Sequence, residues 1–364
     1  MSSLTRLLNI RYPIVQSGMG RVAGPELAAE VSRAGGLGIL AGLNVPAEDL
    51  RAQIQRVRSL TDAPFGVNLW LHPDVERPID PATLSSADVA SVNDALNAAR
   101  RAVGVSESQA RPSPRADLLQ QAIDVVIEAR VPVWSIGLGV PSPPIVERCH
   151  AHDVRVMVMV TNVEDARTAA EWGADIVVAQ GAEAGGHRST WRPGARADVG
   201  TFALVPEIVD AVRVPVVAAG GIADGRGLVA ARALGAAGVL LGTRFVATRE
   251  SMAPDFWKQA ILRSASDATT VTRAFTGLPA RVLRNRLQEE YEAAQAPVLP
   301  GLLQAALEQD VWLAAARGNR PDYFPLYAGQ SVGVIHDLPG AADVVRSIVD
   351  EAATVLRNLL IPDP

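Results

Sequence analysis

The sequence of 364 residues is nearly without cysteine and lysine. Cys149 is the single cysteine, which excludes an internal disulfide and a metal site built from several thiolates. Of the 34 basic residues only Lys258 is a lysine, and it follows the last strand that the pattern predicts. A barrel enzyme that forms a Schiff base needs a lysine on an inner strand or at a strand end. The sequence therefore argues against Schiff-base chemistry.

Basic clusters and long apolar runs are also missing. The formal net charge is -5 and no run of Lys and Arg stands out, so we expect no nucleic-acid partner. The amino terminus, MSSLTRLLNIRYP, lacks the apolar core of a signal peptide, and no apolar run approaches the roughly 20 residues of a membrane span. We expect a cytoplasmic protein with no membrane association. Because no His, Asp and Glu side chains recur at ligand spacing, we expect no metal either.

Aromatic residues make up only 4% of the chain, whereas Ala, Val, Leu and Gly are abundant. Small and branched side chains suit parallel strands that helices cover on both faces. Short apolar runs alternate with amphipathic helical stretches up to residue 243, and the strand count is eight. This alternation predicts an α/β fold, a (β/α)8 TIM barrel, because right-handed crossovers between parallel strands lead to closure. The predicted strands span residues 12–18, 36–42, 64–71, 132–139, 154–160, 175–180, 214–221 and 238–243.

This alternation assigns residues 1–243 to the barrel. We predict three further segments, one inserted in the barrel and two that follow it. Residues 72–115 are rich in proline and include one helical stretch, so we predict an insertion in the third loop that could act as a partial lid. Residues 244–326 have a helical pattern, clearest at 280–294, which predicts a small helical subdomain beside the barrel mouth and a possible homodimer interface. Residues 327–364 are expected to return to the barrel with a closing amphipathic helix.

The stretch DIVVAQGAEAGGH joins the sixth predicted strand to a glycine-rich turn. If the strand belongs to a barrel, Gln180 and His187 lie at the carboxyl mouth, where barrel enzymes keep their chemistry. Gly185 and Gly186 leave space for a substrate beside the imidazole. A neutral imidazole at that place can take a proton or hold a substrate oxyanion.

Two later turns, AAGGIADG and LLGTRF, follow the seventh and eighth predicted strands. In barrels these two turns commonly bind a phosphate group with backbone N–H groups, so Gly220, Gly221 and the hydroxyl of Thr243 predict a phosphorylated ligand. Asn68 and Gln180, at the ends of strands three and six, could offer amide donors and acceptors to a heterocycle that lies across the mouth.

Several ordered motifs of the chain resemble those of the nitronate monooxygenases, formerly called 2-nitropropane dioxygenases. The resemblance covers nearly the whole chain, and QGAEAGGHR is its most specific part. The other motifs are YPIVQSGMG, AGGLGILAG, VNLW, VPVVAAGGIADGRG, LLGTRFVATRES, TRAFTGLPARVLRN and YAGQSVG.

The resemblance implies a barrel that binds FMN without a covalent link and oxidises an alkyl nitronate with O2 to a carbonyl compound and nitrite. It places His187 on the family's catalytic histidine and Met19 beside the flavin ring. It implies flavin contacts at Asn68, Gln180 and Gly185, and a phosphate cradle at Gly221, Leu240, Leu241, Gly242 and Thr243.

Two alternatives stay open on the sequence. The first is a related flavin reductase that uses NADH or NADPH to reduce a quinone or an enoyl thioester, because the shared motifs report flavin binding more than the second substrate. The second is a flavin-free barrel that isomerises or binds a sugar phosphate with the same phosphate loops. The amide pair of Asn68 and Gln180 fits a flat ring better than a sugar phosphate.

Overall fold

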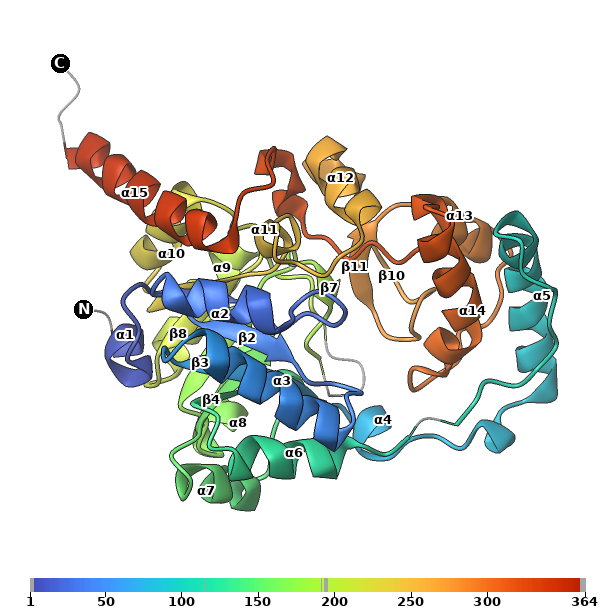
Figure 1. Ribbon diagram of the computed structural model, residues 1–364, viewed down its shortest axis with the longest axis horizontal. Helices are drawn as coiled ribbons and strands as arrows, with labels where there is room; N and C mark the ends of the chain where they lie inside the picture. The colour runs from blue at the N-terminus through green and yellow to red at the C-terminus, as the bar shows by residue number, and fades with distance from the viewer. Residues whose placement is uncertain (1–2, 115, 191, 193–195, 361–364) are drawn as a thin grey trace.

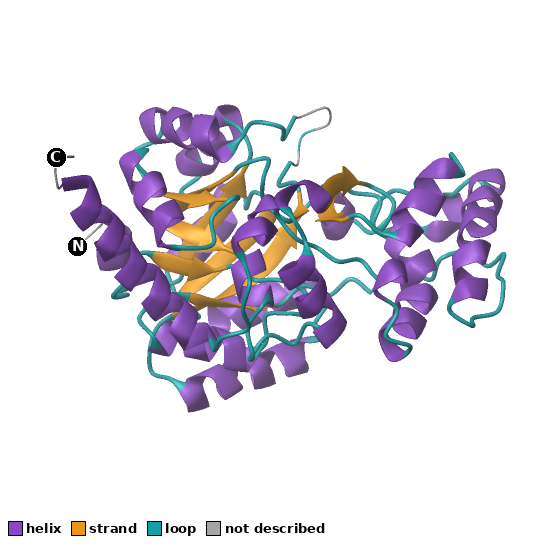
Figure 2. Ribbon diagram, turned by 90° about the horizontal axis from the view of Figure 1, so that it is seen from above, coloured by secondary structure: helices purple, strands orange, loops and turns teal. Residues whose placement is uncertain are grey.

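The computed structural model describes residues 3–114, 116–190, 192 and 196–360. The extreme ends of the predicted barrel and carboxyl-terminal ranges lie outside the described residues, as does residue 115 of the predicted insertion. Figure 1 shows two lobes side by side, a barrel with its helices and a second lobe made mostly of helices. The same division is clear from above in Figure 2, where helices surround the strands of the barrel.

The barrel contains eight parallel strands among the described residues, so the predicted (β/α)8 TIM barrel is confirmed. The strand order is β1-β9-β8-β6-β5-β4-β3-β2. β1 pairs with β9 on one side, and a parallel bridge from Val15 to Leu37 connects its other side to the start of β2. The strands are β1 (Ile14–Gln16), β2 (Gly38–Ala41), β3 (Phe65–Leu71), β4 (Val133–Gly139), β5 (Arg155–Val160), β6 (Ile176–Gln180), β8 (Val216–Ala219) and β9 (Gly238–Leu241).

Helices follow these strands on the outside, as the alternating pattern predicts. The position after β9 holds only the short α11, and the carboxyl-terminal helix α15 packs there between α10 and α2. The chain end therefore completes the ring of helices. The surrounding helices are α2 (Pro25–Arg33), α3 (Ala47–Leu60), α6 (Leu119–Glu128), α7 (Pro143–His150), α8 (Val163–Glu171), α9 (Thr201–Ala211), α10 (Gly225–Ala233), α11 (Thr243–Val246) and α15 (Ala341–Leu360).

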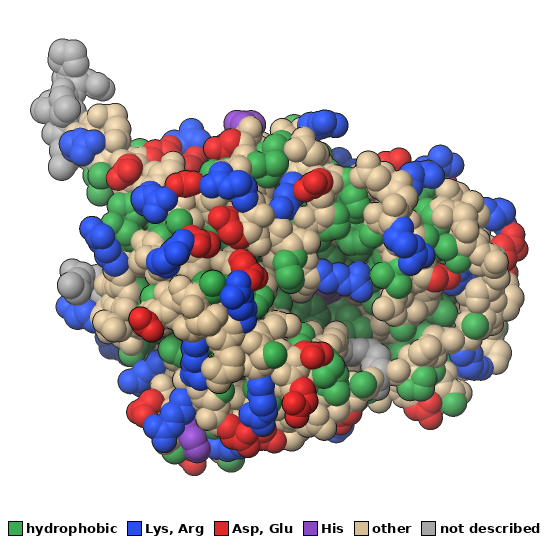
Figure 3. Space-filling view, in the orientation of Figure 1, with side chains coloured by type: hydrophobic (Ala, Val, Ile, Leu, Met, Phe, Trp, Pro, Cys, Tyr) green, Lys and Arg blue, Asp and Glu red, His purple; other side chains and the backbone are tan. Residues whose placement is uncertain are grey.

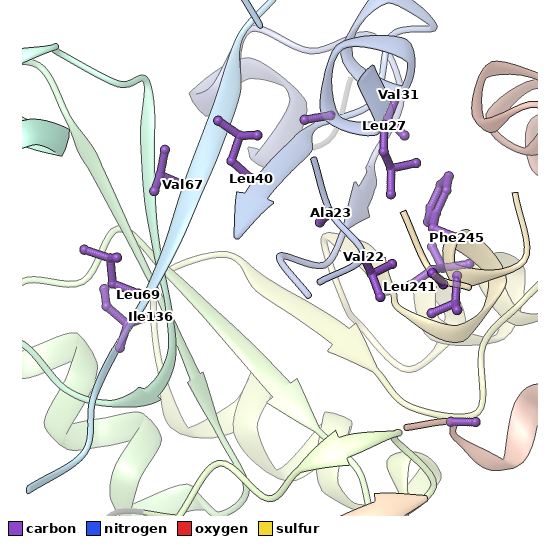
Figure 4. Close-up of a cluster of buried hydrophobic side chains, with 14 of the residues drawn as sticks. Val22, Ala23, Leu27, Val31, Leu40, Val67, Leu69, Ile136, Leu241 and Phe245 are labelled. Atoms are coloured by element: carbon purple, nitrogen blue, oxygen red, sulfur yellow. The ribbon is translucent and has the colours of Figure 1, made fainter. Parts of the chain in front are cut away.

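Two apolar layers hold the barrel together, because successive side chains of a strand point to opposite faces. Ile39, Val178 and Leu240 belong to the interior cluster, which also contains Leu4 and Leu8 of α1 (Ser3–Leu8). Helix α1 therefore covers the amino end of the barrel. The outer cluster lies between strands and helices, and Figure 4 shows part of it, with Leu27 and Val31 of α2, Leu40 of β2, Leu241 of β9 and Phe245 of α11.

The second lobe is assembled from segments far apart in the sequence. Helix α5 (Ser86–Ala102), from the proline-rich insertion, packs against α13 (Arg286–Ala293) and α14 (Leu303–Arg317). The remaining described elements of the insertion and of the second lobe are α4 (Pro73–Glu76), α12 (Asp255–Arg263), β10 (Thr269–Thr272), β11 (Ala280–Leu283) and the 3-10 turns at Pro81–Thr83, Ser266–Ala268, Pro321–Tyr323 and Gln330–Val334.

The contact between α5 and α14 is polar and buried. The side chain of Arg100 is 1% exposed, and its Nε atom donates to Asp310 at 2.9 Å. The same guanidinium donates to Asn93 and Asn97, both at 2.9 Å, and to the carbonyl of Leu307 at 3.1 Å. We call these five residues the Arg100 cluster.

The predicted helix at 280–294 is wrong in its first part. Residues 280–283 form β11, which pairs antiparallel with β10, and helix α13 begins only at Arg286. Asn285 sets this boundary, because its side chain accepts a hydrogen bond from the backbone N–H of Gln288 and caps the helix. No helix of the described residues has the length and apolar character that a membrane span requires.

Candidate active site

His187 lies at the junction of the two lobes. It belongs to β7 (Gly186–His187), which follows β6 of the barrel but pairs antiparallel with β11 of the second lobe, His187 opposite Ala280. The turn that leads there needs glycine, because Gly186 has a φ of +77°. In Figure 3 the surface is hollowed between the lobes, with hydrophobic and basic side chains in the hollow.

The imidazole of His187 lies between two aromatic rings. The centroid of the Trp70 ring is 4.7 Å away with the planes at 67°, and the centroid of the Tyr327 ring is 5.4 Å away. On the third side, the Nε2 atom is 2.9 Å from Oγ1 of Thr276, in the turn between β10 and β11. Residues from β3, the β10–β11 turn and the segment after α14 therefore fix one side chain.

Burial is the main reason that the imidazole is neutral. It lowers the pKa of His187 to about 3, and the nearby charges of Arg188 and His72 act in the same direction. His187 is therefore an uncharged base throughout the neutral range. His72 accepts a hydrogen bond from the N–H of Asp74 and caps α4.

Arg188 shapes the glycine-rich turn before His187. Its side chain is 4% exposed, and its guanidinium donates to backbone carbonyls of the turn. A buried carbonyl without a partner is costly, so these bonds stabilise a turn that has no regular structure of its own. Burial lowers the pKa of Arg188 to about 10, so the guanidinium stays charged at neutral pH. The carbonyls belong to Gly181, Ala182, Ala184 and Gly186.

Gln180 acts on the same turn from its other end. Its side-chain amide donates to the carbonyl of His187 at 3.0 Å and accepts from the N–H of Ser189 at 2.9 Å. The sequence places Gln180 toward a ligand, and the structure adds these two bonds to the backbone at the end of the glycine-rich turn. One N–H of the amide remains for a ligand.

Asn68 has an unpaired acceptor at the mouth. Its Nδ2 donates to the carbonyl of Gly18 at 3.0 Å, whereas its buried Oδ1 has no partner among the described residues. A Cβ atom on Gly137 of β4 would lie 3.1 Å from that oxygen. The glycine therefore leaves the amide open on this side, and a ring N–H would satisfy the oxygen.

The two predicted phosphate turns lie at the ends of β8 and β9. Gly220 and Gly221 have φ values of +106° and +72°, which side chains other than glycine rarely adopt. Among the described residues, no hydrogen bond engages the N–H groups of Gly221, Gly242 or Thr243. The hydroxyl of Thr243 accepts from the N–H of Gly329 at 2.9 Å.

The remaining predicted residues divide between the mouth and the scaffold. The sulfur of Met19 lies 3.5 Å from where a Cβ of Gly242 would stand, so Met19 borders this turn. A Cβ on Gly185 would come within 2.5 Å of Ala328, so Gly185 allows the segment 328–329 to pass. The side chains of Leu240 and Leu241 pack in the two apolar layers, so these residues can meet a ligand only through their backbone.

Glu183 has a structural contact that the sequence did not predict. Its carboxylate accepts from the N–H of Thr201 at 2.8 Å and from the Thr201 hydroxyl at 2.9 Å, at the first residue of α9. An acidic group stabilises a helix amino terminus, and here the carboxylate of Glu183 occupies the amino terminus of α9. An anionic ligand would therefore bind at the turns after β8 and β9 and not at α9. Within the described ranges, no group of three or more His, Cys, Asp and Glu side chains could hold a metal ion.

Comparisons with known proteins place this chain in a family. The family model for nitronate monooxygenase matches residues 1–351. A probable nitronate monooxygenase of Staphylococcus haemolyticus is 38% identical over 362 residues, which are 99% of this chain and 98% of that protein. The chain belongs to the nitronate monooxygenase family. It is an oxidoreductase of that family.

Two solved structures support this assignment. The nitroalkane oxidase from Streptomyces ansochromogenes is 35% identical, covers 98% of this chain and 100% of its own, and has a TM-score of 0.88. FabK from Thermotoga maritima is 32% identical, covers 99% of this chain and 98% of its own, and has a TM-score of 0.77. The nitronate monooxygenase fold is thus shared over both lobes.

Sequence analysis missed four side chains of this family member's mouth, Trp70, Arg188, Thr276 and Tyr327. Trp70 carried a usable signal, because it stands two residues after Asn68 on the same strand. The register of β3 against β4 shifts between Leu69 and Trp70, where β4 contributes the extra residue Gly137. The only signal in the sequence for the other three side chains is that they lie in the quoted motifs. No spacing in the chain predicts that Arg188, Thr276 and Tyr327 come together.

Proposed function

We propose that this protein binds FMN and oxidises alkyl nitronates with O2 to a carbonyl compound and nitrite. The observation that carries the proposal is the neutral imidazole of His187, held between Trp70 and Tyr327 at the carboxyl mouth of the barrel. Nitronates are small anions that a neutral imidazole can receive, and the same imidazole can take the C–H proton of the parent nitroalkane.

The residues of the mouth fit a flavin mononucleotide. Gly221, Gly242 and Thr243 offer the phosphate N–H groups that no described residue engages. The Oδ1 of Asn68, unpaired among the same residues, offers an acceptor to a ring N–H. Gln180 has one N–H left, and Met19 borders the phosphate turn. FMN, when bound, supplies the electron transfer between nitronate and O2 that no side chain of the chain can perform.

The first experiment is the visible absorption spectrum of the purified protein, followed by release of the pigment by heat. An FMN spectrum with free flavin in the supernatant supports the cradle. A colourless protein that also fails to take up added FMN contradicts the proposal and leaves the sugar-phosphate barrel. For turnover, nitrite formation and O2 uptake with a nitronate are measured for the wild type and for His187→Asn, which should retain FMN and lose most activity.

The phosphate turn has a matched control. Gly221→Ala forces a side chain into a φ of +72°, and Gly104→Ala does the same at +76° in open space, in the loop after α5. The backbone cost is about 1 to 2 kcal/mol in both. FMN affinity should fall at least about tenfold in Gly221→Ala and stay unchanged in Gly104→Ala. Equal affinities in the two variants would remove Gly221 from the cradle.

The pH profile tests the state of His187. Because the pKa of His187 in the folded protein is about 3, below its usual 6.5, the base is already deprotonated above about pH 4. We expect kcat/KM for nitronate oxidation to show no ascending limb from His187 between pH 5 and 8. An ascending limb near pH 6.5 that disappears in His187→Asn would contradict a neutral His187.

The reductase remains the main alternative activity. Anaerobic mixing of the flavin-loaded protein with NADH separates the two activities, because rapid bleaching of the flavin indicates a reductase. Absence of bleaching together with nitrite production from a nitronate supports the oxidation that we propose.

A further inference from the structure

The hydroxyl of Thr276 is a junction of hydrogen bonds next to His187. Thr276 is 5% exposed, and its Oγ1 lies 2.9 Å from Nε2 of His187. The same oxygen lies 3.2 Å from the carbonyl of Leu278 and 3.4 Å from the N–H of Leu278. A hydroxyl has one hydrogen to donate, so it can satisfy either the imidazole or the carbonyl but not both.

The two arrangements differ in what they leave unpaired. If the hydroxyl donates to Nε2, the carbonyl of Leu278 loses its partner in a region where Thr276 and Leu278 are both buried. If the hydroxyl donates to that carbonyl, Nε2 carries a hydrogen and donates it to Oγ1, and the hydroxyl, the carbonyl and Nε2 are all paired. Buried polar groups are paired with few exceptions, so the second arrangement is favoured.

The second arrangement leaves Nδ1 of His187 without a hydrogen. No described residue makes a hydrogen bond with Nδ1. The ring cannot turn freely to exchange its nitrogens, since Trp70 and Tyr327 pack against it. The tautomer is thereby coupled to the position of one hydroxyl group.

We propose that Thr276 is a positioning residue that fixes His187 as its Nε2–H tautomer, so that Nδ1 is the nitrogen that accepts a proton during turnover. This inference rests on the proposed role of His187. When the substrate enters as the neutral nitroalkane, the proton that leaves its C–H goes to Nδ1, and the electron pair stays on the substrate, which becomes the nitronate. The imidazolium that results keeps its Nε2–H bond to Thr276, and its charge returns to neutral when Nδ1 gives the proton to water.

The place of Thr276 in the fold explains how it reaches the histidine. Thr276 belongs to the turn between β10 and β11, and β11 pairs with the two residues of β7 that contain His187. The N–H of Arg188 donates to the carbonyl of Pro279 at 2.9 Å, which extends that pairing. The second lobe therefore supplies the orienting group, and the barrel supplies the base.

Three variants separate positioning from packing. Thr276→Val keeps the shape and removes the hydroxyl, whereas Thr276→Ser keeps the hydroxyl. Thr272→Val is the matched control, because Thr272 is also 5% exposed and its hydroxyl contacts Glu292 and the N–H of Ala274, not the histidine. We expect kcat with a neutral nitroalkane to fall about 100-fold in Thr276→Val, and by less than about 5-fold in Thr276→Ser and Thr272→Val.

The decisive readout is independent of activity. The protein is labelled with ¹⁵N-histidine. An NMR spectrum that correlates the carbon-bound ring protons with both ring nitrogens then identifies which nitrogen is protonated in each of the 5 histidines. The His187→Asn spectrum assigns the His187 signals. We expect Nε2–H in the wild type and in Thr276→Ser, and a measurable Nδ1–H fraction in Thr276→Val.

An Nδ1–H signal for His187 in the wild type would overturn the inference, and so would a Thr276→Val variant with unchanged tautomer and unchanged kcat. If Thr276→Val does not fold, the wild-type and Thr276→Ser spectra still decide the tautomer. If the wild type shows Nε2–H but no nitronate is oxidised, the proposed function fails and the assignment of the tautomer stands.

Discussion

The barrel interior and the contact between α5 and α14 bury different kinds of side chain. The barrel interior consists of residues such as Ile39, Val178 and Leu240, which pack with no polar partner to find. The second lobe buries Arg100, which donates to Asp310 of α14, and it buries Gln304 and Glu308, which bond to each other within α14. Apolar packing tolerates imperfect direction, whereas a buried polar group needs its partner in place. The barrel is therefore specified by pattern, and the second lobe is specified by particular contacts.

The strongest way to break this contrast is Arg100→Ala. The substitution leaves Asp310, Asn93, Asn97 and the carbonyl of Leu307 without their common donor between α5 and α14. We expect the free energy of unfolding to fall by about 3 to 5 kcal/mol, because partners of a buried charge are left unpaired. Urea denaturation measures the loss. A loss below 1 kcal/mol would mean that apolar packing alone holds α5 in place.

Ile39→Ala tests the barrel interior. Ile39 is 0% exposed within the interior cluster, and truncation leaves a cavity that the surrounding strands cannot close. We expect a loss of about 3 kcal/mol in the free energy of unfolding. Val271→Ala, at a valine that is 42% exposed on β10, should change it by less than about 0.5 kcal/mol. Similar losses in both variants would contradict the contrast between core and surface.

Glu308 sharpens the comparison through pH. Its carboxyl group accepts from Gln304 at 2.8 Å and from the indole of Trp312 at 3.0 Å, and burial raises its pKa from 4.5 to about 8. Between these two pKa values the unfolded chain has lost the proton that the folded protein keeps, so stability falls as the pH rises. We expect the wild type to lose about 3 kcal/mol more than Glu308→Gln between pH 5 and 8, measured by urea denaturation at each pH.

The control for that experiment is Ile39→Ala at the same pH values. Ile39 packs within the apolar interior cluster. The difference in free energy of unfolding between the wild type and Ile39→Ala should therefore be equal at pH 5 and pH 8. A wild type whose stability relative to Glu308→Gln does not change over this window would show that the carboxylate is ionised in the folded protein.

The smallest effect is expected for Arg101→Ala, one residue along α5 from Arg100. The Arg101 side chain is 61% exposed and pairs with Glu107, which is 55% exposed. Exposed ion pairs contribute little, so the free energy of unfolding should change by less than about 0.5 kcal/mol. Two adjacent arginines on one helix thus give the largest and the smallest predicted loss. Equal losses would show that burial does not distinguish them.

The sequence by itself determined the barrel. Apolar runs that alternate with amphipathic stretches place eight strands within a few residues of where they lie, because local periodicity decides which residues face a core. The sequence also marks the tight turns of the mouth through the glycines at 185, 186, 220 and 221. Each of them stands where the backbone has a positive φ or passes close to another segment. His187 was placed at the mouth by the same reasoning, as the first polar side chain after such a turn.

Tertiary structure alone decided what surrounds His187. Trp70, Thr276 and Tyr327 come from three separate segments, and no local pattern records that they meet on one imidazole. The strand β11 was mistaken for helix, because its pairing with β7 and β10 is a long-range contact that outweighs the local helical pattern. The protonation and tautomer of His187 belong to this second class, since burial and partners set them and both exist only in the folded chain.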